Sequence, residues 1–163
     1  MPIGEQTEND VPVTVASPVT SLSAAREMCA RSGWSISNLE LQKLLYLAQM
    51  VYMGEHGGQR LFNGRFEAWE LGPVLPDVYR RARVYVADPV QDVFFGAPRV
   101  ADPERLRTIH AAFDQLSSRS PSELVNITHW SGGAWAKRYQ PGVRGIVIPD
   151  DDILAEARAR GIN

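Results

Sequence analysis

The stretch of sequence that decides the fold is SNLELQKLLYLAQMVYMG, residues 37–54. Its apolar side chains recur three and four positions apart, which is the spacing of one face of an α-helix. Ser37 is followed three residues later by Glu40, a capping box that predicts where the helix begins. Because Leu39 and Leu47 widen the apolar stripe, we expect this helix to lie at the centre of the core.

Other helices are predicted on both sides of this one, from N-capping residues and apolar stripes. Ser21 or Ser23 can cap the first of them, Asp102 a later one, and Ser120 the next, with Glu123 completing a second capping box. The predicted helices cover residues 20–33, 77–84, 101–117, the segment after 120, 135–139 and 150–160.

The segments between these helices carry weaker signals. Residues 61–71 lack a helical period and contain Asn63-Gly64, a turn signal, so we expect an irregular hairpin or an extended connection. Residues 90–95 are predicted as a short strand, and 146–148 form a short apolar run. The fold class is therefore mainly α: a compact single-domain helical bundle with at most a small β-hairpin or short strands.

Composition narrows the class of protein. The chain of 163 residues has a formal charge of −2, which argues against nucleic acid as the main partner. Cys29 is the only cysteine, so no intrachain disulfide can form, as in a reducing compartment. No apolar stretch approaches the ~18 residues of a membrane span, and residues 1–19 do not resemble a secretory signal. We expect a cytoplasmic protein with a flexible arm at 1–19 and one domain at 20–163.

The usual signatures of catalysis and metal binding are missing from the sequence. It has no glycine-rich phosphate loop, nucleophile elbow or metalloprotease helix. His56, His110 and His129 stand far apart, whereas structural zinc sites show closely spaced ligand pairs. His110 lies on an apolar stripe and is best explained as a core histidine. We therefore predict no catalytic residue, no metal and no cofactor, and expect a protein that is not an enzyme.

Three segments in series resemble the Panacea-domain antitoxin family, which includes SocA-like proteolytic adaptors and phage-associated proteins of the GepA type. The segments are LQKLLYLA at 41–48, FEAWELGPV at 66–74 followed by Val78 and Tyr79, and Leu124 with Thr128, His129 and Trp135. The resemblance covers about residues 22–157. Leu47 and Leu71 stand where the family often has aromatic residues, which affects packing detail rather than membership.

The resemblance implies a compact helical fold and an antitoxin that neutralises a toxin encoded beside it. For the SocA type, neutralisation means delivery of the toxin to the ClpXP protease. The partners implied are thus a cognate toxin protein and the ClpXP protease. The family motif positions offered as partner-binding residues are Gln42, Lys43, Tyr46, Trp69, Glu70, Tyr79, His129 and Trp135.

Two other interpretations stay open at this point. A small enzyme or ligand-binding protein could use Glu67, Glu70, Tyr79 and His129, if these side chains met in one cleft with shifted pKa values. A DNA-binding repressor is less well supported, because the charge is wrong for it.

Overall fold

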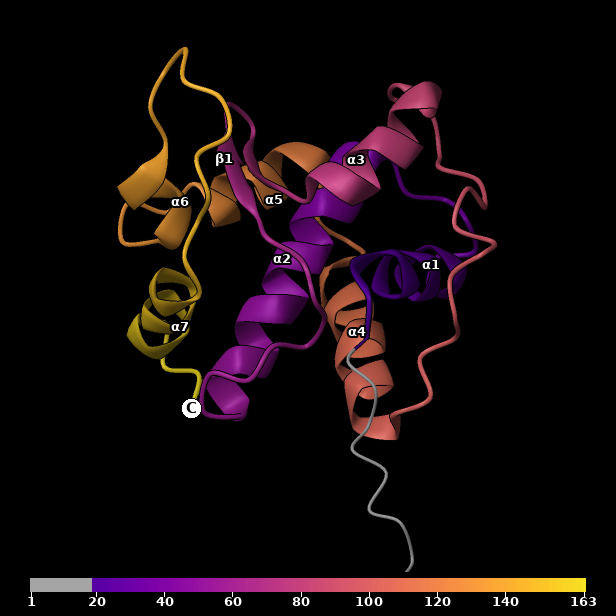
Figure 1. Ribbon diagram of the computed structural model, residues 1–163, viewed down its shortest axis with the longest axis horizontal. Coiled ribbons are helices and arrows are strands. Elements are labelled where there is room, and N and C mark those ends of the chain that lie inside the picture. Colours follow the sequence, from indigo (N-terminus) through magenta and orange to yellow (C-terminus); the bar gives the residue numbers. More distant parts are fainter. Residues whose placement is uncertain (1–18) are drawn as a thin grey trace, which may run out of the picture.

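The computed structural model describes residues 19–163, and Figure 1 shows their arrangement. The predicted fold class is confirmed: the described chain is mainly helical, with one small antiparallel hairpin. Most of the predicted arm, residues 1–18, lies outside the described residues, so the division into arm and domain stays a prediction. The elements are α1 (Ser21–Arg31), α2 (Asn38–Glu55), β1 (Glu67–Trp69), β2 (Gly72–Val74), α3 (Pro76–Ala82), η1 (Arg83–Tyr85), α4 (Pro103–Leu116), α5 (Pro121–Thr128), α6 (Ala134–Arg138) and α7 (Asp150–Ala159).

Helix α2 runs through the middle of the molecule, as its sequence predicts (Figure 1). The capping box is present, with Ser37 accepting from the Glu40 amide and Glu40 accepting from the Ser37 amide. Every residue from 41 to 50 is buried. Helices α1, α4, α5 and α7 pack around α2, so its side chains are buried on nearly all sides.

The outer helices begin close to where the sequence predicts them. Asp102 caps α4, and Ser120 with Glu123 forms the capping box of α5. The predicted cap of α1 is wrong: Thr20, rather than Ser21 or Ser23, accepts the Ser23 amide. Ser21 and Ser23 both lie inside the helix and are buried, and Ser23 Oγ accepts from the Thr20 hydroxyl.

The hairpin has its turn at Glu70-Leu71, with Ala68 opposite Pro73 and Trp69 opposite Gly72. The Asn63-Gly64 pair is therefore not the hairpin turn. Asn63 instead donates its amide to the Val19 carbonyl at 2.7 Å and pairs with the chain just before α1. The apolar run at 146–148 lies along the other edge of β1, where two backbone hydrogen bonds hold it.

The predicted strand at residues 90–95 is wrong, because this segment forms no ladder with any other part of residues 19–163. The Val90 amide makes a single bond to the Ile36 carbonyl, and the Phe94 amide bonds to the Asp92 side chain. Val90 and Phe94 are buried all the same. The apolar pattern that resembled a strand therefore marks side chains that anchor a loop to the core.

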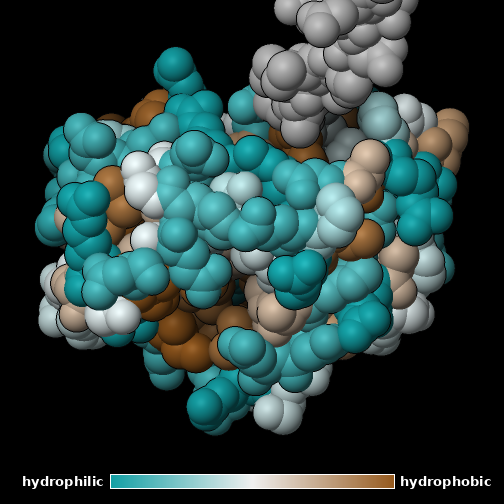
Figure 2. Space-filling model, turned by 90° about the horizontal axis from the view of Figure 1, so that it is seen from below, coloured by the Kyte–Doolittle hydropathy of each residue, from teal (hydrophilic) through white to brown (hydrophobic). Residues whose placement is uncertain are grey.

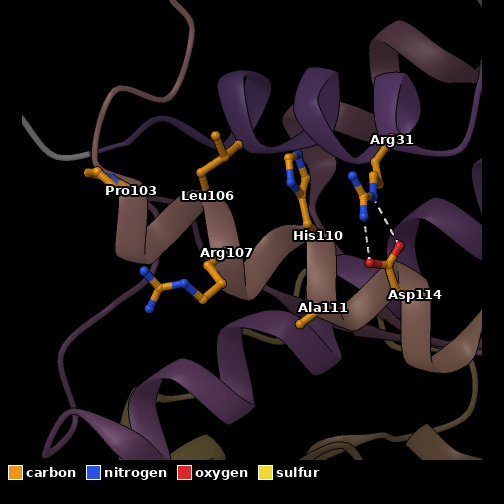
Figure 3. Close-up of a pocket in the computed structure, with 7 residues that line it drawn as sticks. All are labelled: Arg31, Pro103, Leu106, Arg107, His110, Ala111 and Asp114. Atoms are coloured by element: carbon orange, nitrogen blue, oxygen red, sulfur yellow. Dashed lines mark hydrogen bonds and ion pairs between the residues drawn. The ribbon is translucent and has the colours of Figure 1, made fainter.

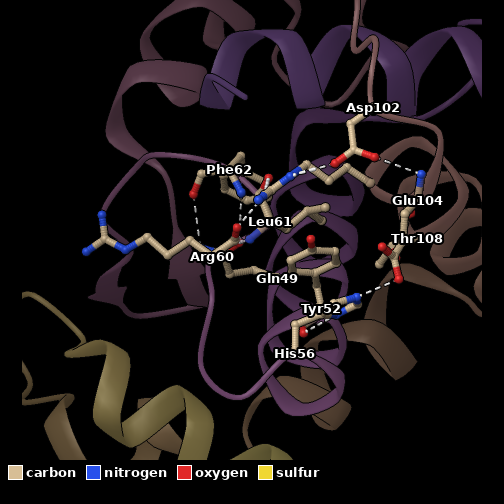
Figure 4. A network of polar contacts seen from close by, with 10 residues as sticks. Gln49, Tyr52, His56, Arg60, Leu61, Phe62, Asp102, Glu104 and Thr108 are labelled. Carbon is tan, nitrogen blue, oxygen red and sulfur yellow. Dashed lines mark hydrogen bonds and ion pairs between the residues drawn. The ribbon is translucent and has the colours of Figure 1, made fainter. Parts of the chain in front are cut away.

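A polar network fixes the loop between α2 and the hairpin (Figure 4). Gln49 Oε1 accepts the amides of Leu61 and Phe62, and its Nε2 donates to the Phe62 carbonyl. Arg105 on α4 donates to the Leu61 carbonyl at 2.7 Å and stacks over Tyr52. This loop leads directly into β1, so the network fixes where the hairpin starts.

The surface is more hydrophilic than the core around α2. Figure 2 shows the face that lies below in Figure 1, where most side chains are hydrophilic and hydrophobic ones show only in patches. Within residues 19–163, no helix is both long enough and apolar enough to cross a membrane.

Candidate partner-binding site

A groove of about 330 Å³ lies where α2, the hairpin and α3 meet. The start of α2 forms its floor, the hairpin forms one wall, and α3 with the residue after η1 forms the other. Ten residues line it: Asn38, Leu39, Gln42, Lys43, Trp69, Glu70, Leu71, Val74, Tyr79 and Val86.

Two buried side chains of α2 hold the hairpin in place beneath the groove. Lys43 Nζ donates to the Pro73 carbonyl at 2.9 Å, and Gln42 Oε1 accepts the Leu75 amide at 2.8 Å. Lys43 is fully buried, and burial lowers its pKa to about 7. Gly72 has a φ of +114°, and a Cβ there would lie 3.1 Å from Lys43 Nζ. The glycine of the Gly72-Pro73 pair thus permits both the turn and the close approach of the lysine.

The walls of the groove are aromatic and apolar. The rings of Trp69 and Tyr79 meet edge to face, with centroids 4.7 Å apart, and both side chains are half-buried. Leu71 at the hairpin turn is 55% exposed, and Val86 on the opposite wall is 79% exposed. Exposed apolar side chains beside half-buried aromatic rings are typical of a surface that binds another protein.

Val86 is held in a conformation that valine rarely adopts. Its φ of +55° lies in the left-handed region, where a β-branched side chain is strained. Its amide donates to the Arg83 carbonyl and closes η1. Strained residues gather at functional sites, where the surrounding structure maintains them. The strain at Val86 therefore makes this rim of the groove a candidate functional surface. The sequence alone does not reveal it.

The charges on the α3 side of the groove are mostly positive. Arg83 lies one helical turn beyond Tyr79, its amide donating to the Tyr79 carbonyl. Arg81 and Arg83 are exposed, and neither makes an ion pair with any of the described residues, whereas Arg80 pairs with Asp77. Glu70, at the turn of the opposite wall, is exposed and acidic.

Tyr46 belongs to the first of the three segments that resemble the family, at residues 41–48, but it lies in the interior instead of the groove. The Tyr46 hydroxyl donates to Glu156 Oε1 at 2.7 Å, and the Ala134 amide donates to the same oxygen at 2.9 Å. Arg160 Nε donates to Glu156 Oε2 at 2.9 Å. Glu156 is fully buried, so this junction fastens α2, α6 and α7 together.

The third motif segment packs behind the hairpin. His129 stacks on Trp135 with ring centroids 3.7 Å apart, and the Trp135 Nε1 donates to the Trp69 carbonyl at 2.7 Å. Burial, followed by the nearby Lys43, lowers the pKa of His129. Its Nε2 is buried and has no hydrogen-bond partner among the described residues. Trp135 therefore supports the hairpin strand that carries Trp69.

Comparison with known proteins decides the family. The sequence profile described as "Antitoxin SocA-like, Panacea domain" matches residues 41–136, more than half of the chain. The chain belongs to this family. Antitoxin SocA of Caulobacter vibrioides (strain NA1000 / CB15N) is 38% identical over 110 residues, which are 61% of this chain and 58% of that protein. No solved structure matches the chain.

The family's motif positions divide into two groups in the structure. Gln42, Lys43 and Tyr46 are at most 1% exposed, which makes them internal supports in the described state. Trp69, Glu70 and Tyr79 lie at the groove with exposed or half-buried side chains, while His129 and Trp135 are half-buried behind the hairpin. Partner contact by any of the eight remains a prediction.

The residues suggested for a small enzyme do not all meet. Glu70 and Tyr79 line the groove, but Glu67 and His129 do not. The Glu67 carboxylate accepts from Trp69 Nε1 at 3.1 Å, and the His129 ring stacks on Trp135. The convergence that would favour acid–base catalysis is therefore lacking for this set.

The sequence-based prediction missed several residues of the groove and its support. In the sequence, Leu71 is distinguished only as a departure from the family pattern, and Val86 carries no signal at all. Glu156 does carry one: an acidic residue between the apolar positions Ile153 and Ala157 of an amphipathic helix indicates a buried carboxylate. Nothing in the sequence separates the run Arg80, Arg81 and Arg83 from an ordinary solvated helix end.

A second cavity, of about 370 Å³, lies between α1 and α4 (Figure 3). Arg31 and Asp114 form a two-point ion pair beside it, with N···O distances of 2.7 and 3.0 Å. His110 lines this cavity and is half-buried, so it is not the enclosed core histidine that the sequence predicts. None of the exposed large hydrophobic residues in the described part of the chain lines it. The groove at the hairpin is therefore the better candidate for binding a protein.

Proposed function

We propose that this protein is an antitoxin, which binds a toxin protein encoded beside it and neutralises that toxin. Family membership supports the class of function, as does the name of the relative in Caulobacter vibrioides. We assign toxin binding to the groove in this proposal, because Leu71 and Val86 are exposed there next to Trp69 and Tyr79. A few apolar and aromatic anchors of this kind supply most of the binding energy of a protein interface.

We further propose that neutralisation proceeds by delivery of the bound toxin to the ClpXP protease in the cytoplasm. An adaptor needs two contacts, one for its client and one for the protease. The groove is the client contact in this proposal, and residues 1–18 supply the second contact as a tether. Linking two contacts raises the effective concentration of the client at the protease.

A growth assay in cells that express the neighbouring toxin tests the antitoxin proposal. Leu71→Asp places a charge in the groove, and we expect it to abolish both rescue of growth and co-purification of the toxin. Because Leu71 is 55% exposed, the free energy of unfolding should change by no more than about 0.5 kcal/mol.

The matched control is Phe95→Asp, which changes a large apolar residue that is 76% exposed but lies outside the groove lining and away from the α3 wall. Phe95→Asp should rescue growth like the unaltered protein. If Leu71→Asp also rescues growth fully, the groove is not the toxin-binding site. Absence of rescue by the unaltered protein would count against the antitoxin role itself.

Degradation of the toxin tests the adaptor step separately. The full chain should shorten the half-life of the toxin in a reaction with purified ClpXP and ATP, and a chain lacking residues 1–18 should bind the toxin without that effect; Val19 is kept because it is buried in the core. Equal degradation with and without these residues would contradict the tether.

A further inference from the structure

We infer that the groove recognises a segment of its partner through side chains: one large apolar residue seated between the walls and a carboxylate next to it that pairs with Arg83. This inference rests on the proposed function, because it takes the groove to be the surface that binds the partner. It adds the chemistry that the partner must carry. Three features of the groove lead to it.

The first feature is that the hairpin offers no free edge for strand addition in the described chain. Residues 146–148 occupy the outer edge of β1. On the side of β2 that faces α2, Pro73 has no N–H, its carbonyl accepts from Lys43, and the Leu75 amide bonds to Gln42. A partner strand would find these backbone groups already used, so recognition must occur through side chains.

The second feature is the size and lining of the groove. A volume of about 330 Å³ is at the lower end of the range of ~300–1,000 Å³ for ligand pockets. An α-helix is about 10 Å across with its side chains, so the groove fits one or two side chains of a partner rather than a whole helix. Trp69, Tyr79, Leu71 and Val86 give an apolar lining, which favours an apolar occupant.

The third feature is the unequal charge of the two walls. Along residues 76–88, Arg81 and Arg83 have no ion-pair partner among the described residues, and Asp88 is the one acid left unpaired. Arg83 is not itself a lining residue, but it lies one helical turn beyond Tyr79, on the same helix face, and so stands beside the groove. Glu70 on the hairpin wall repels a carboxylate from that side. A carboxylate on the partner is therefore directed to the α3 wall, where Arg83 presents a planar, two-point donor.

A library of random peptides displayed on phage, selected against the full chain, tests the inference without knowledge of the toxin. Enriched peptides should share a large apolar residue with Asp or Glu beside it. A synthetic peptide from this set should bind Arg83→Glu at least about tenfold more weakly than the unaltered protein. Its binding should also weaken as salt is raised, and it should be lost in Leu71→Asp.

Arg119→Glu makes the same change in charge at an exposed residue outside the groove and should leave the affinity unchanged. Enriched peptides that lack an acidic residue would overturn the inference. So would equal binding to Arg83→Glu, or the absence of any enriched peptide that depends on Leu71. These results leave the growth assay unaffected, so failure of the inference and failure of the antitoxin role are separate outcomes.

Discussion

Two regions along α2 use polar side chains in opposite ways. At the junction of α2 with α7, Tyr46, Glu156 and Arg160 satisfy one another in the interior. At the groove, one turn earlier on α2, Gln42 and Lys43 are equally buried but hold up a hairpin whose outer surface is exposed. The same short motif therefore builds a closed junction at one end and supports an open surface at the other.

This difference shows that residues of one family motif can have two different roles. A motif residue can be essential because it holds the fold or because it touches a partner, and its identity alone does not separate the two. Exposure separates them here: Tyr46 and Lys43 are fully buried, whereas Leu71, which departs from the pattern, is half exposed.

The largest effect is expected at the closed junction. Glu156→Ala leaves two buried donors, the Tyr46 hydroxyl and the Ala134 amide, without their acceptor and removes the ion-pair partner of Arg160, which keeps its bond to the Ile127 carbonyl. Each buried donor left without a partner costs about 1 to 3 kcal/mol, so the free energy of unfolding should fall by about 3 to 5 kcal/mol. Chemical denaturation measures it.

Tyr46→Phe is the matched control, since it removes a single hydrogen bond and keeps the ring that packs on Phe66. Its cost should be smaller, about 1 to 3 kcal/mol. If both variants lose equally little stability, the junction is not the fastening point of α7. Selective loss of toxin binding in Glu156→Ala with unchanged stability would assign the junction to the partner instead.

A pH-dependent effect is expected at the support of the groove. Burial lowers the pKa of Lys43 to about 7 in the folded protein, from an ordinary value of 10.5 that the unfolded chain retains. Between these values the unfolded chain binds more protons, so stability rises with pH. The slope should be about 1 kcal/mol per pH unit between roughly pH 7.5 and 8.5.

Cys29 opposes Lys43 above about pH 9. Burial raises the pKa of this thiol from 9.0 to about 12, so the folded protein keeps a proton that the unfolded chain loses, and this contribution offsets the rise in stability that comes from Lys43. Lys43→Met should remove most of the slope between pH 7.5 and 8.5. An unchanged slope in that variant would show that Lys43 is not the titrating group.

The sequence predicts the helix that carries Tyr46 better than the hairpin that forms the groove. The capping box at Ser37 and the apolar spacing of α2 are local signals, and both predict the central helix correctly. The fold around Tyr46 follows from such periodicity. In contrast, the hairpin turn depends on tertiary contacts: Asn63 resembles a turn residue but pairs with Val19.

The groove could be predicted only in part for the same reason. Trp69 and Tyr79 belong to the motif, and the sequence brings both forward as contact residues. Val86 lies at the rim because η1 ends there with a positive φ, and no sequence pattern announces a valine in that conformation. The exposure of Leu71 likewise follows from the position of the turn, which the sequence misplaces.

A small gain in stability, and the clearest separation of stability from binding, is expected at Val86. Glycine accepts positive φ without strain, so Val86→Gly releases strain of about 1 to 3 kcal/mol but adds freedom to the unfolded chain worth about 0.5 to 1 kcal/mol. The net change should be a small gain, about 1 kcal/mol in the free energy of unfolding. Toxin binding should weaken, because the variant lacks the apolar side chain at the rim.

Val86→Ala is the control: it keeps a Cβ and hence most of the strain, so it should weaken binding without the gain in stability. A loss of stability in Val86→Gly would show that the side chain, although 79% exposed, contributes to the fold and not only to the groove.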